Sequence, residues 1–522
     1  MHVPLTVSDF LDRAALVYPE RTAVVDEPGV PGSFGTITYG ELAERAAGMA
    51  VALDQLHVPV GGRVGIVSPN AARFLTSYFG VSGFGRVLVP INFRLNAAEI
   101  GFIVEHSGTE VLLVDPEYDK ELAGVSARVR IVLDGVDDAE LFAPAAGRVP
   151  RGWDPDEDAT CSINYTSGTT ARPKGVELTH RNCALNAMAL GWHTGVTDRD
   201  VLLHTLPMFH CNGWGMPYAV TGMGGRHVVL RKVDGEEILR RIEDEQVTLM
   251  CGAPAVVAAV LAAAESRVSE GRPVPMAARN GQSPTRAVRI VVAGAPPPSS
   301  VIERVEAELG WEFIQIYGLT ETSPLLTVNR APLEWDGLPS NERSRLLARA
   351  GTPAIGVRMA LDGDGEILAR SNHVFRGYWR QPEESERVLA DGWFRTGDGG
   401  RFDGAFVVIS DRKKDVIISG GENISSIEVE DALYGHPAVL EAAVIGVPDE
   451  RWGETVKALV VLRPGATAGE ADLVEFCRSQ LAHFKCPTSI ELRDSLPRTA
   501  TGKLQKFKLR QPYWQDRDSQ VN

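Results

Sequence analysis

Short apolar segments alternate with amphipathic segments through most of the chain. Arg63–Val67, Val111–Val114 and Ile290–Val292 are aliphatic runs with the length of buried strands. Between such runs, segments such as Asp234–Ile242 place apolar residues at helical spacing. This alternation predicts an α/β fold. Two polar segments rich in Pro, Gly and Arg are predicted to be surface insertions: 270–286 and 332–349.

The chain has 522 residues, which is more than one compact core usually holds. Charges cluster at Asp411–Asp415, directly after the apolar run Phe406–Ile409. The sequence that follows has the helix and strand patterns of a small α+β unit. We therefore predict domains over 1–410 and 411–522, with a hinge near Asp411.

The overall composition excludes several classes of protein. A formal net charge of -15 opposes non-specific binding to nucleic acid or to anionic lipid. The most apolar stretch, 253–264, is shorter than the ~20 residues of a membrane-spanning helix, and the N-terminus lacks a signal-peptide pattern. The six cysteines include no C-x-x-C pair, so we expect buried free thiols and a cytoplasmic location.

The strongest motif is the segment Thr166–Gly175, TSGTTARPKG, which follows an apolar run. Glycine lets backbone N–H groups face an anion, while hydroxyl groups and Lys174 add donors and charge. The segment differs from a Walker loop, because the order G-x-x-x-x-G-K-[ST] is missing. It indicates a site for a triphosphate, and a hydroxyl-rich turn between strands is the alternative.

Three further motifs are weak when each is taken alone. Tyr317 offers a ring that could stack on a base, and Glu321 offers a carboxylate for Mg²⁺. Asp398 follows a strand-like run and could accept hydrogen bonds from ribose hydroxyls. Lys503, on a Thr-Gly turn, could act as a mobile cation. The alternatives are an ordinary strand end, a turn and a solvated basic tail.

Together, and in this order, the motifs resemble those of the adenylate-forming superfamily of acyl-CoA synthetases, luciferases and non-ribosomal adenylation domains. The matching segments are Thr166–Gly175, Tyr317–Glu321, Arg395–Asp398, Asp411–Asp415 and Thr501–Lys503. The resemblance covers nearly the whole chain and is closest to bacterial medium- or long-chain fatty-acyl-CoA synthetases. It implies a large N-terminal α/β domain with stacked sheets and a small, mobile α+β C-terminal domain, with ATP bound between them.

The resemblance also implies roles for individual residues. The phosphates would contact Thr166, Ser167, Gly168, Thr169, Thr170, Lys174 and Thr320, with Glu321 on Mg²⁺. The nucleoside would contact Gly294, Ala295, Pro296, Tyr317, Gly318, Asp398 and Arg412. Lys503 would bridge the substrate carboxylate and the α-phosphate. A carboxylate must approach an anionic phosphorus in this reaction, so positioning and fixed positive charge matter more than a covalent nucleophile.

In the second half-reaction of such enzymes, the thiolate of coenzyme A attacks the acyl adenylate. The small domain would rotate about Asp411, withdraw Lys503 and bring up the loop with Gly420 and Gly421, unless these glycines form a plain tight turn. The acyl pocket would be lined by His210, Trp214, Gln315, Ile316 and Leu319. His210 would face the reacting carboxylate, while Trp214 would gate the tunnel or simply be a core aromatic residue. Segment 207–214 has no Lys or Arg to pair with a second carboxylate, which predicts an apolar monocarboxylic acid.

Three positions depart from the family pattern. Ala171 stands where glycine is usual, which costs stability if φ is positive there. Ile316 also replaces a usual glycine and would reshape the acyl pocket. The segment after Asp398 turns early, at Asp403-Gly404.

Other functions stay open at this point. The acyl group could pass to a separate carrier protein, although His210 replaces the Asp that is typical of peptide-synthetase pockets. Luciferase-type oxygenation shares only the adenylation step. An inactive scaffold relative should have lost Lys503, Glu321 or the phosphate loop, and all are present. The expected partners are a small carboxylic acid and CoA, no nucleic acid, and a second copy in a homodimer.

Overall fold

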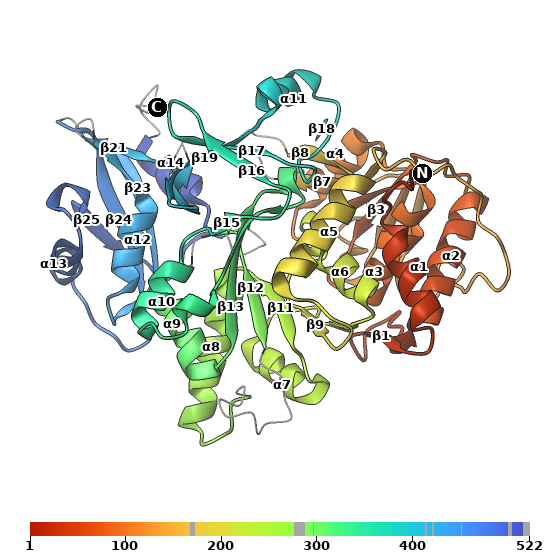
Figure 1. Cartoon of the computed structure of the whole chain (residues 1–522), viewed down its shortest axis with the longest axis horizontal. Coiled ribbons are helices and arrows are strands. Elements are labelled where there is room, and N and C mark those ends of the chain that lie inside the picture. Colours follow the sequence, from red (N-terminus) through yellow and green to blue (C-terminus); the bar gives the residue numbers. More distant parts are fainter. Residues whose placement is uncertain are drawn as a thin grey trace.

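The computed structural model describes residues 1–166, 173–275, 288–295, 297–412, 415–419, 422–449, 451–498 and 504–514. Within these segments the strands form four β-sheets, of nine, seven, four and five strands. Figure 1 shows the small C-terminal part, in blue, beside the larger N-terminal part. The α/β class and the large and small parts are as the sequence predicts.

The nine-stranded sheet has a parallel centre with antiparallel edges. The chain reaches β10 on one side of β9 and β11 on the other, so a topological switch point lies between β9 and β11. Ligand crevices in open α/β sheets form outside the carboxyl ends of strands at such points. In spatial order the strands are β15 (Thr352–Pro353), β14 (Leu325–Arg330), β13 (Glu312–Gly318), β12 (Arg289–Val292), β11 (Leu249–Gly252), β9 (Val201–His204), β10 (Arg226–Val229), β1 (Thr22–Val25) and β2 (Thr36–Thr38).

The seven-stranded sheet ends in an antiparallel pair, β8 and β18, which lies next to the parallel strands. Its strands are, in spatial order, β18 (Gly377–Tyr378), β8 (Lys174–Thr179), β7 (Thr160–Thr166), β4 (Val87–Ile91), β3 (Arg63–Val67), β5 (Val111–Val114) and β6 (Val129–Val132). β3 and β5 have the bounds that the aliphatic runs of the sequence predict.

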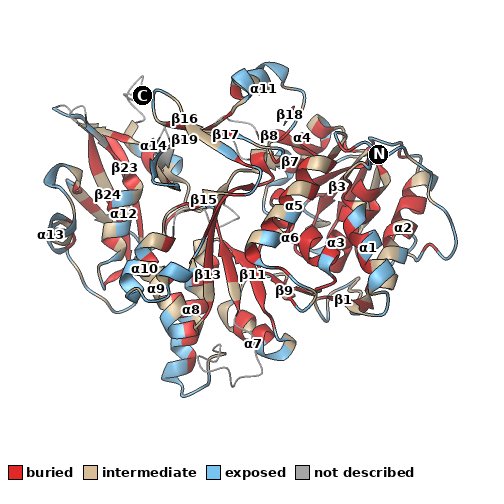
Figure 2. Cartoon of the chain, viewed as in Figure 1, coloured by how far each residue is buried: buried red, intermediate tan, exposed pale blue. Residues whose placement is uncertain are grey.

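One hydrophobic core joins these two sheets, with Ile66 from the smaller sheet and Ile314 from the larger one. The helices that contribute to it include α1 (Ser8–Val17), α2 (Tyr39–Gln55), α3 (Ala72–Gly80), α4 (Ala97–Ser107), α5 (His180–Thr194) and α6 (Met216–Met223). Figure 2 shows the strands of both sheets as mostly buried. Strands covered on both faces read as continuous apolar runs, which is why they were recognisable in the sequence.

A second core covers the other face of the nine-stranded sheet and contains Phe313 of β13. Its helices are α7 (Gly235–Glu245), α8 (Pro254–Ser269), α9 (Ser299–Arg304) and α10 (Ser340–Leu347). Leu347 is fully buried in this core, so the segment 332–349 is not purely a surface insertion as the sequence suggested. Of the other expected insertion, residues 276–286 lie outside the described residues.

The four-stranded sheet contains β16 (Arg358–Leu361), β17 (Glu366–Arg370), β19 (Phe394–Asp403) and β20 (Phe406–Arg412), and α11 (Pro382–Val388) precedes β19. β19 and β20 form one hairpin that turns at Gly404, where φ is +60°. The short segment after Asp398 is therefore part of a strand, with a register irregularity between Gly399 and Gly400. Asp411 lies inside β20 and pairs with Gly399.

The small C-terminal part is built on β21 (Ile417–Ser419), β22 (Glu422–Ile424), β23 (Val439–Asp449), β24 (Gly453–Leu462) and β25 (Ser489–Leu492). Helices α12 (Ser426–Tyr434) and α13 (Glu470–Gln480) share one core with this sheet, and α14 (Lys506–Trp514) shares another. The backbone N–H of Ser299 in α9 donates a 3.2 Å hydrogen bond to Oδ1 of Asp431 in α12, which joins the two parts.

Two sequence expectations concern the whole chain. All six cysteines are free and buried, as predicted. Among the described residues, no helix is both long enough and apolar enough to cross a membrane.

Candidate active site

The carboxyl end of β13 meets the β19–β20 hairpin. The hydroxyl of Tyr317 donates a 2.8 Å hydrogen bond to Oδ2 of Asp398, whose side chain is buried. Asp398 and Arg412 are direct partners across the hairpin. The structure thus brings together three of the residues predicted to bind the nucleoside; the side chain of Arg412 lies outside the described residues.

The predicted phosphate loop connects two antiparallel strands. Thr166 ends β7, Lys174 begins β8, and the two residues are direct cross-strand partners. The loop is therefore closed at its base, and both ends of it are half-buried. Ser167, Gly168, Thr169, Thr170 and Ala171 lie outside the described residues.

Glu321 lies in a short 3-10 turn, η5 (Thr320–Thr322), that follows β13. Its Oε1 accepts a 2.9 Å hydrogen bond from the hydroxyl of Tyr378, and its carbonyl accepts a 2.8 Å bond from the backbone N–H of Phe375. Burial, and then the charge of Glu321, raise the pKa of Tyr378 above its usual range, so this hydroxyl stays protonated. The side chain of Glu321 is held in place by a residue that no sequence motif indicated.

The residues predicted to sandwich adenine come from two neighbouring strands of the nine-stranded sheet and the segment after one of them. β12 and β13 are parallel neighbours, so Gly294 and Ala295, which follow β12, lie at the same sheet edge as Tyr317. Gly294 has φ of +93° and is exposed, whereas Pro296 lies outside the described residues. A Cβ on Gly318 would stand 1.5 Å from the carbonyl oxygen of Pro324, so only glycine fits there.

Gln315 is the acyl-pocket candidate whose position differs most from the prediction. Side chains alternate along a strand, so Gln315 shares a face of β13 with Tyr317, and Ile316 points to the opposite face. Gln315 is 5% exposed, and its Oε1 has no hydrogen-bond partner among the described residues. We therefore separate Gln315 from the acyl residues, since one pocket on one face of the strand cannot be lined by both side chains.

The segment around His210 continues into η3 (Cys211–Gly215), where the backbone winds in the left-handed sense. Its five residues have φ between +46° and +79°. L-residues in this conformation cost about 1–2 kcal/mol each, and such strain tends to persist where the surroundings hold it. Here two asparagines do so: Nδ2 of Asn186 donates to the carbonyl of Trp214 at 3.0 Å, and Nδ2 of Asn212 donates to Oγ of Ser162 at 2.8 Å.

The other predicted acyl residues lie around this segment. Trp214 and Ile316 are buried in the main core, while His210 and Leu319 are half-buried. Sγ of Cys211 lies 3.9 Å from the carbonyl oxygen of Thr320, which connects the His210 segment to the turn that carries Glu321. The segment with the acyl-pocket candidate His210 therefore lies next to the turn with Thr320 and Glu321.

The residues expected from the C-terminal part are described only through their neighbours. Gly420 and Gly421 lie outside the described residues, between the paired strand ends Ser419 and Glu422. Lys503 is also outside them, between the bridged residues Arg498 and Leu504. The residues that flank each segment are therefore paired with each other.

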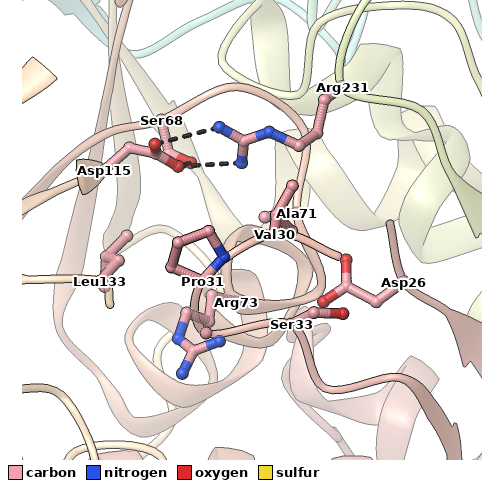
Figure 3. Close-up of a pocket in the computed structure, with 11 residues that line it drawn as sticks. Asp26, Val30, Pro31, Ser33, Ser68, Ala71, Arg73, Asp115, Leu133 and Arg231 are labelled. Atoms are coloured by element: carbon pink, nitrogen blue, oxygen red, sulfur yellow. Dashed lines mark hydrogen bonds and ion pairs between the residues drawn. The ribbon is translucent and has the colours of Figure 1, made fainter. Parts of the chain in front are cut away.

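A separate polar pocket lies outside the carboxyl ends of β1, β3, β5 and β10, away from these residues (Figure 3). Arg231 makes two 3.0 Å bonds to the carboxylate of Asp115 there, and Asp26 accepts bonds from the backbone N–H groups of Phe34 and Ala72. Its charged groups already have partners within the fold, so we assign it no ligand.

Sequence reasoning missed several residues of the site: Tyr378, Glu384, Asn186 and Asn212. Tyr378, Glu384 and Asn186 lie outside the motifs that they support, whereas Asn212 lies within the segment 207–214 itself. The asparagines could have drawn attention as polar residues in otherwise apolar segments.

The fold, with two sheets on one core and a small C-terminal part, and the joined Tyr317 and Asp398 side chains are those expected of an adenylate-forming enzyme. The family model described as "AMP-binding enzyme" matches residues 11–379, and the one described as "AMP-binding enzyme C-terminal domain" matches residues 428–503. The chain belongs to the AMP-binding enzyme family.

Curated relatives extend over almost the whole chain. The chain is 37% identical to 2-methylpropanoate–CoA ligase CCL4 of Humulus lupulus, with 97% of this chain and 95% of the relative aligned. It is 36% identical to acetate/butyrate–CoA ligase AAE7 of Arabidopsis thaliana, with 98% and 94% aligned. These matches confirm the prediction of an ATP-dependent acyl-CoA ligase at the level of the family.

Solved structures agree with this assignment. The o-succinylbenzoate CoA synthetase of Bacillus subtilis, bound to its acyl-adenylate, has a TM-score of 0.80 and 28% identity over 96% of this chain and 97% of that chain. The anthranilate CoA ligase AuaEII with anthranoyl-AMP has a TM-score of 0.85 and 26% identity over 98% of both chains.

Proposed function

We propose that this chain activates a small apolar monocarboxylic acid with ATP and transfers the acyl group to CoA. The observation that carries the proposal is the hydrogen bond between Tyr317 and Asp398, which sets a ring and a carboxylate at the edge beside the phosphate loop. In the first step a carboxylate oxygen attacks the α-phosphorus, and the bond to the bridging oxygen breaks to release pyrophosphate. In the second, the CoA thiolate attacks the acyl carbon, and AMP leaves.

The described residues suit the nucleoside. The Tyr317 ring would stack on adenine, and Asp398, with Arg412, would bind the ribose hydroxyls. Gln315 supports an adenine base in particular, because its buried Oε1 needs a donor and the exocyclic amine of adenine is one. Lys174, Thr166 and Thr320 would contact the phosphates.

Mg²⁺ fits the carboxylate of Glu321. Among the described residues no three acidic, His or Cys side chains form a metal site of their own. Mg²⁺ is commonly bound by one or two carboxylates together with substrate phosphates, and Glu321 beside the phosphate loop supplies such a carboxylate. Bound there, the ion would neutralise charge on the phosphates.

Three parts of the proposal concern the C-terminal residues. We take 1–410 and 411–522 as two bodies with a hinge at Asp411, Lys503 as the cation for adenylation, and the Gly420-Gly421 loop as the passage for pantetheine. Removing a preorganised charge such as Lys503 should cost about 10²–10³ in rate. A homodimer and a cytoplasmic location stay predictions from the sequence.

The acid itself is proposed from the acyl candidates. His210, Trp214, Ile316 and Leu319 combine one imidazole with apolar side chains, which suits an uncharged acyl chain. The names of relatives include 2-methylpropanoate, acetate, butyrate and benzoate, all monocarboxylates. Whether the acid is short, aromatic or a medium- or long-chain fatty acid is the question for experiment.

Mass spectrometry of reactions with Mg·ATP and a panel of acetate, butyrate, 2-methylpropanoate, octanoate and benzoate tests the proposal. With CoA present we expect acyl-CoA and AMP, formed about 10²–10³-fold more slowly by the Lys503→Ala variant. Acyl adenylate that never becomes a thioester would instead indicate a carrier protein as acceptor. Absence of any carboxylate-dependent product would contradict the proposal and favour the inactive scaffold.

A further inference from the structure

Lys174 of the phosphate loop has partners that lie far along the chain. Its ammonium forms an ion pair with Oε1 of Glu384 in α11. It also lies 4.9 Å from the centroid of the Tyr378 ring, within cation–π range. The side chains of Lys174 and Glu384 are 15% and 24% exposed, so water screens this pair only in part.

Glu384 is itself fixed on α11. Arg387, one turn further on, donates to both of its carboxylate oxygens, at 2.7 and 2.9 Å. The Arg387 guanidinium, and then Lys174, lower the pKa of Glu384 to about 2. Glu384 therefore carries its full charge at neutral pH and faces the residue that is proposed to meet the phosphates of ATP.

Tyr378 connects this pair to Glu321. Its ring contacts Lys174, and its hydroxyl donates to Oε1 of Glu321. Tyr378 is placed by β18, which pairs with β8 so that Tyr378 lies opposite Val176, two residues beyond Lys174. Its backbone N–H also donates to Oγ of Ser385 in α11 at 2.8 Å. The Tyr378 side chain thus contacts both Lys174, the lysine proposed to bind the phosphates, and Glu321, the candidate metal ligand.

We infer that Tyr378 and Glu384 are positioning residues of the nucleotide site: Tyr378 aligns Glu321 for Mg²⁺, and Glu384 holds Lys174 until the phosphates replace it. The inference rests on the proposed function, since it assumes that ATP binds here. Hydrogen bonds to a metal-binding carboxylate orient it, and their loss commonly weakens metal binding. The Glu384 carboxylate competes with the phosphates for one ammonium, which lowers the affinity for ATP.

Calorimetric titration of ATP, with Mg²⁺ and with EDTA, tests the role of Tyr378. Tyr378→Phe keeps the ring and removes the hydroxyl, so we expect ATP affinity in EDTA to be unchanged. The gain in affinity that Mg²⁺ provides should shrink about tenfold. Tyr513→Phe is the control, because it removes another tyrosine–carboxylate bond, 2.6 Å to Glu491, in the C-terminal part. A Mg²⁺ gain equal to that of the wild type would overturn the role of Tyr378.

The same titration in EDTA tests Glu384. Glu384→Gln keeps the shape and removes the charge, so ATP should bind about threefold more tightly. Glu383→Gln removes an exposed charge from the adjacent position and should leave the affinity unchanged. The proposal that Glu384 competes with the phosphates for Lys174 would be wrong in either of two cases. In the first, Glu384→Gln binds ATP no more tightly than the wild type; in the second, Glu383→Gln gives the same increase in affinity.

Thermal melting checks that each variant keeps its fold. ATP binding by the wild-type chain distinguishes failure of the positioning roles from failure of the proposed function. If the wild type binds ATP and the variants behave like it, the positioning roles are wrong and the proposed function stands. If the wild type binds no ATP in either buffer, the proposed function fails and this inference fails with it.

Discussion

The hydroxyl of Tyr317 and the carboxylate of Asp398 are joined by a 2.8 Å hydrogen bond between strands of two different sheets. Tyr317 stands near the carboxyl end of β13, and Asp398 stands in the middle of β19, opposite Arg412 at the end of β20. The bond fixes the orientation of both side chains before a nucleotide arrives. Such preorganisation lowers the entropic cost of binding.

Tyr317→Phe should therefore weaken nucleotide binding without removing the stacking ring. Loss of a hydrogen bond to a charged group costs about 1.5–3 kcal/mol, so we expect the KM for ATP to rise about tenfold or more. The change in kcat should be small, because the bond is distant from the phosphates. Steady-state kinetics with varied ATP measures both, and Tyr513→Phe is the matched control. An unchanged KM would mean that the bond is only structural.

Ile316→Ala tests the acyl pocket. Ile316 is 1% exposed, so truncation should lower the free energy of unfolding by about 2–5 kcal/mol and leave a cavity. If Ile316 borders the acyl group, kcat/KM should shift from 2-methylpropanoate towards bulkier acids such as benzoate or octanoate. Ile314→Ala is the control, since Ile314 is fully buried on the same face, two residues earlier. An equal shift in both variants would exclude a direct role for Ile316.

Gly215→Ala tests the left-handed segment after His210. Gly215 has φ of +79°, and a Cβ there would stand 2.5 Å from Nδ2 of Asn186, the atom that binds the carbonyl of Trp214. We expect a loss of about 1–3 kcal/mol in stability and a larger rise in KM for the acid than for ATP. Gly61→Ala has the same backbone problem, φ of +75°, with nothing near its Cβ. A rise in acid KM that Gly61→Ala reproduces would count against a site-specific effect.

Buried histidines should make the fold sensitive to acid. Nε2 of His204 and Nδ1 of His227 lie 3.0 Å apart, and both rings are buried. Burial lowers the pKa of His204 to about 3 and that of His227 well below its usual value of 6.5. Between pH 6.5 and about 4 the unfolded chain binds protons that the folded chain does not. The free energy of unfolding should therefore fall as pH falls, by up to about 1.4 kcal/mol per pH unit for each histidine.

Melting temperatures measured from pH 7.5 to pH 5 check this expectation. His204→Gln should lose less stability over that range than the wild type, because one of the buried histidines with a lowered pKa is gone. His483→Gln, at an exposed position, should follow the wild-type curve. Identical acid sensitivity in all three proteins would contradict the assignment.

The sequence predicted the buried strands well, for a physical reason. Strands such as β3 and β5 are buried on both faces, so hydrophobicity alone marks them. The motif residues Thr166 and Lys174 lie at paired strand ends, Glu321 lies in the turn after β13, and Asp398 lies within β19. The side-chain partners were not predictable in this way. Tyr378 meets Glu321 through a two-residue strand paired with β8, and such long-range pairing leaves no local pattern.

Motifs also do not show on which face of a strand a residue lies or where a strand ends. Gln315 and Ile316 are neighbours in β13 and therefore point to opposite sides of the sheet. The cross-strand pairs of β20 continue to Arg412, so the predicted hinge residue Asp411 lies within a strand.

That continuation of β20 has a mechanical consequence. A rotation about Asp411, as we propose, must peel the last residues of β20 from β19, next to the residue that binds Tyr317. A nucleotide bound to Asp398 would therefore stabilise this strand pairing and oppose the rotation. Dissociation of the nucleotide would allow the rotation. Amide hydrogen exchange of residues 398–412 should then report on the catalytic cycle. We expect slow exchange with ATP bound and faster exchange once the product has dissociated.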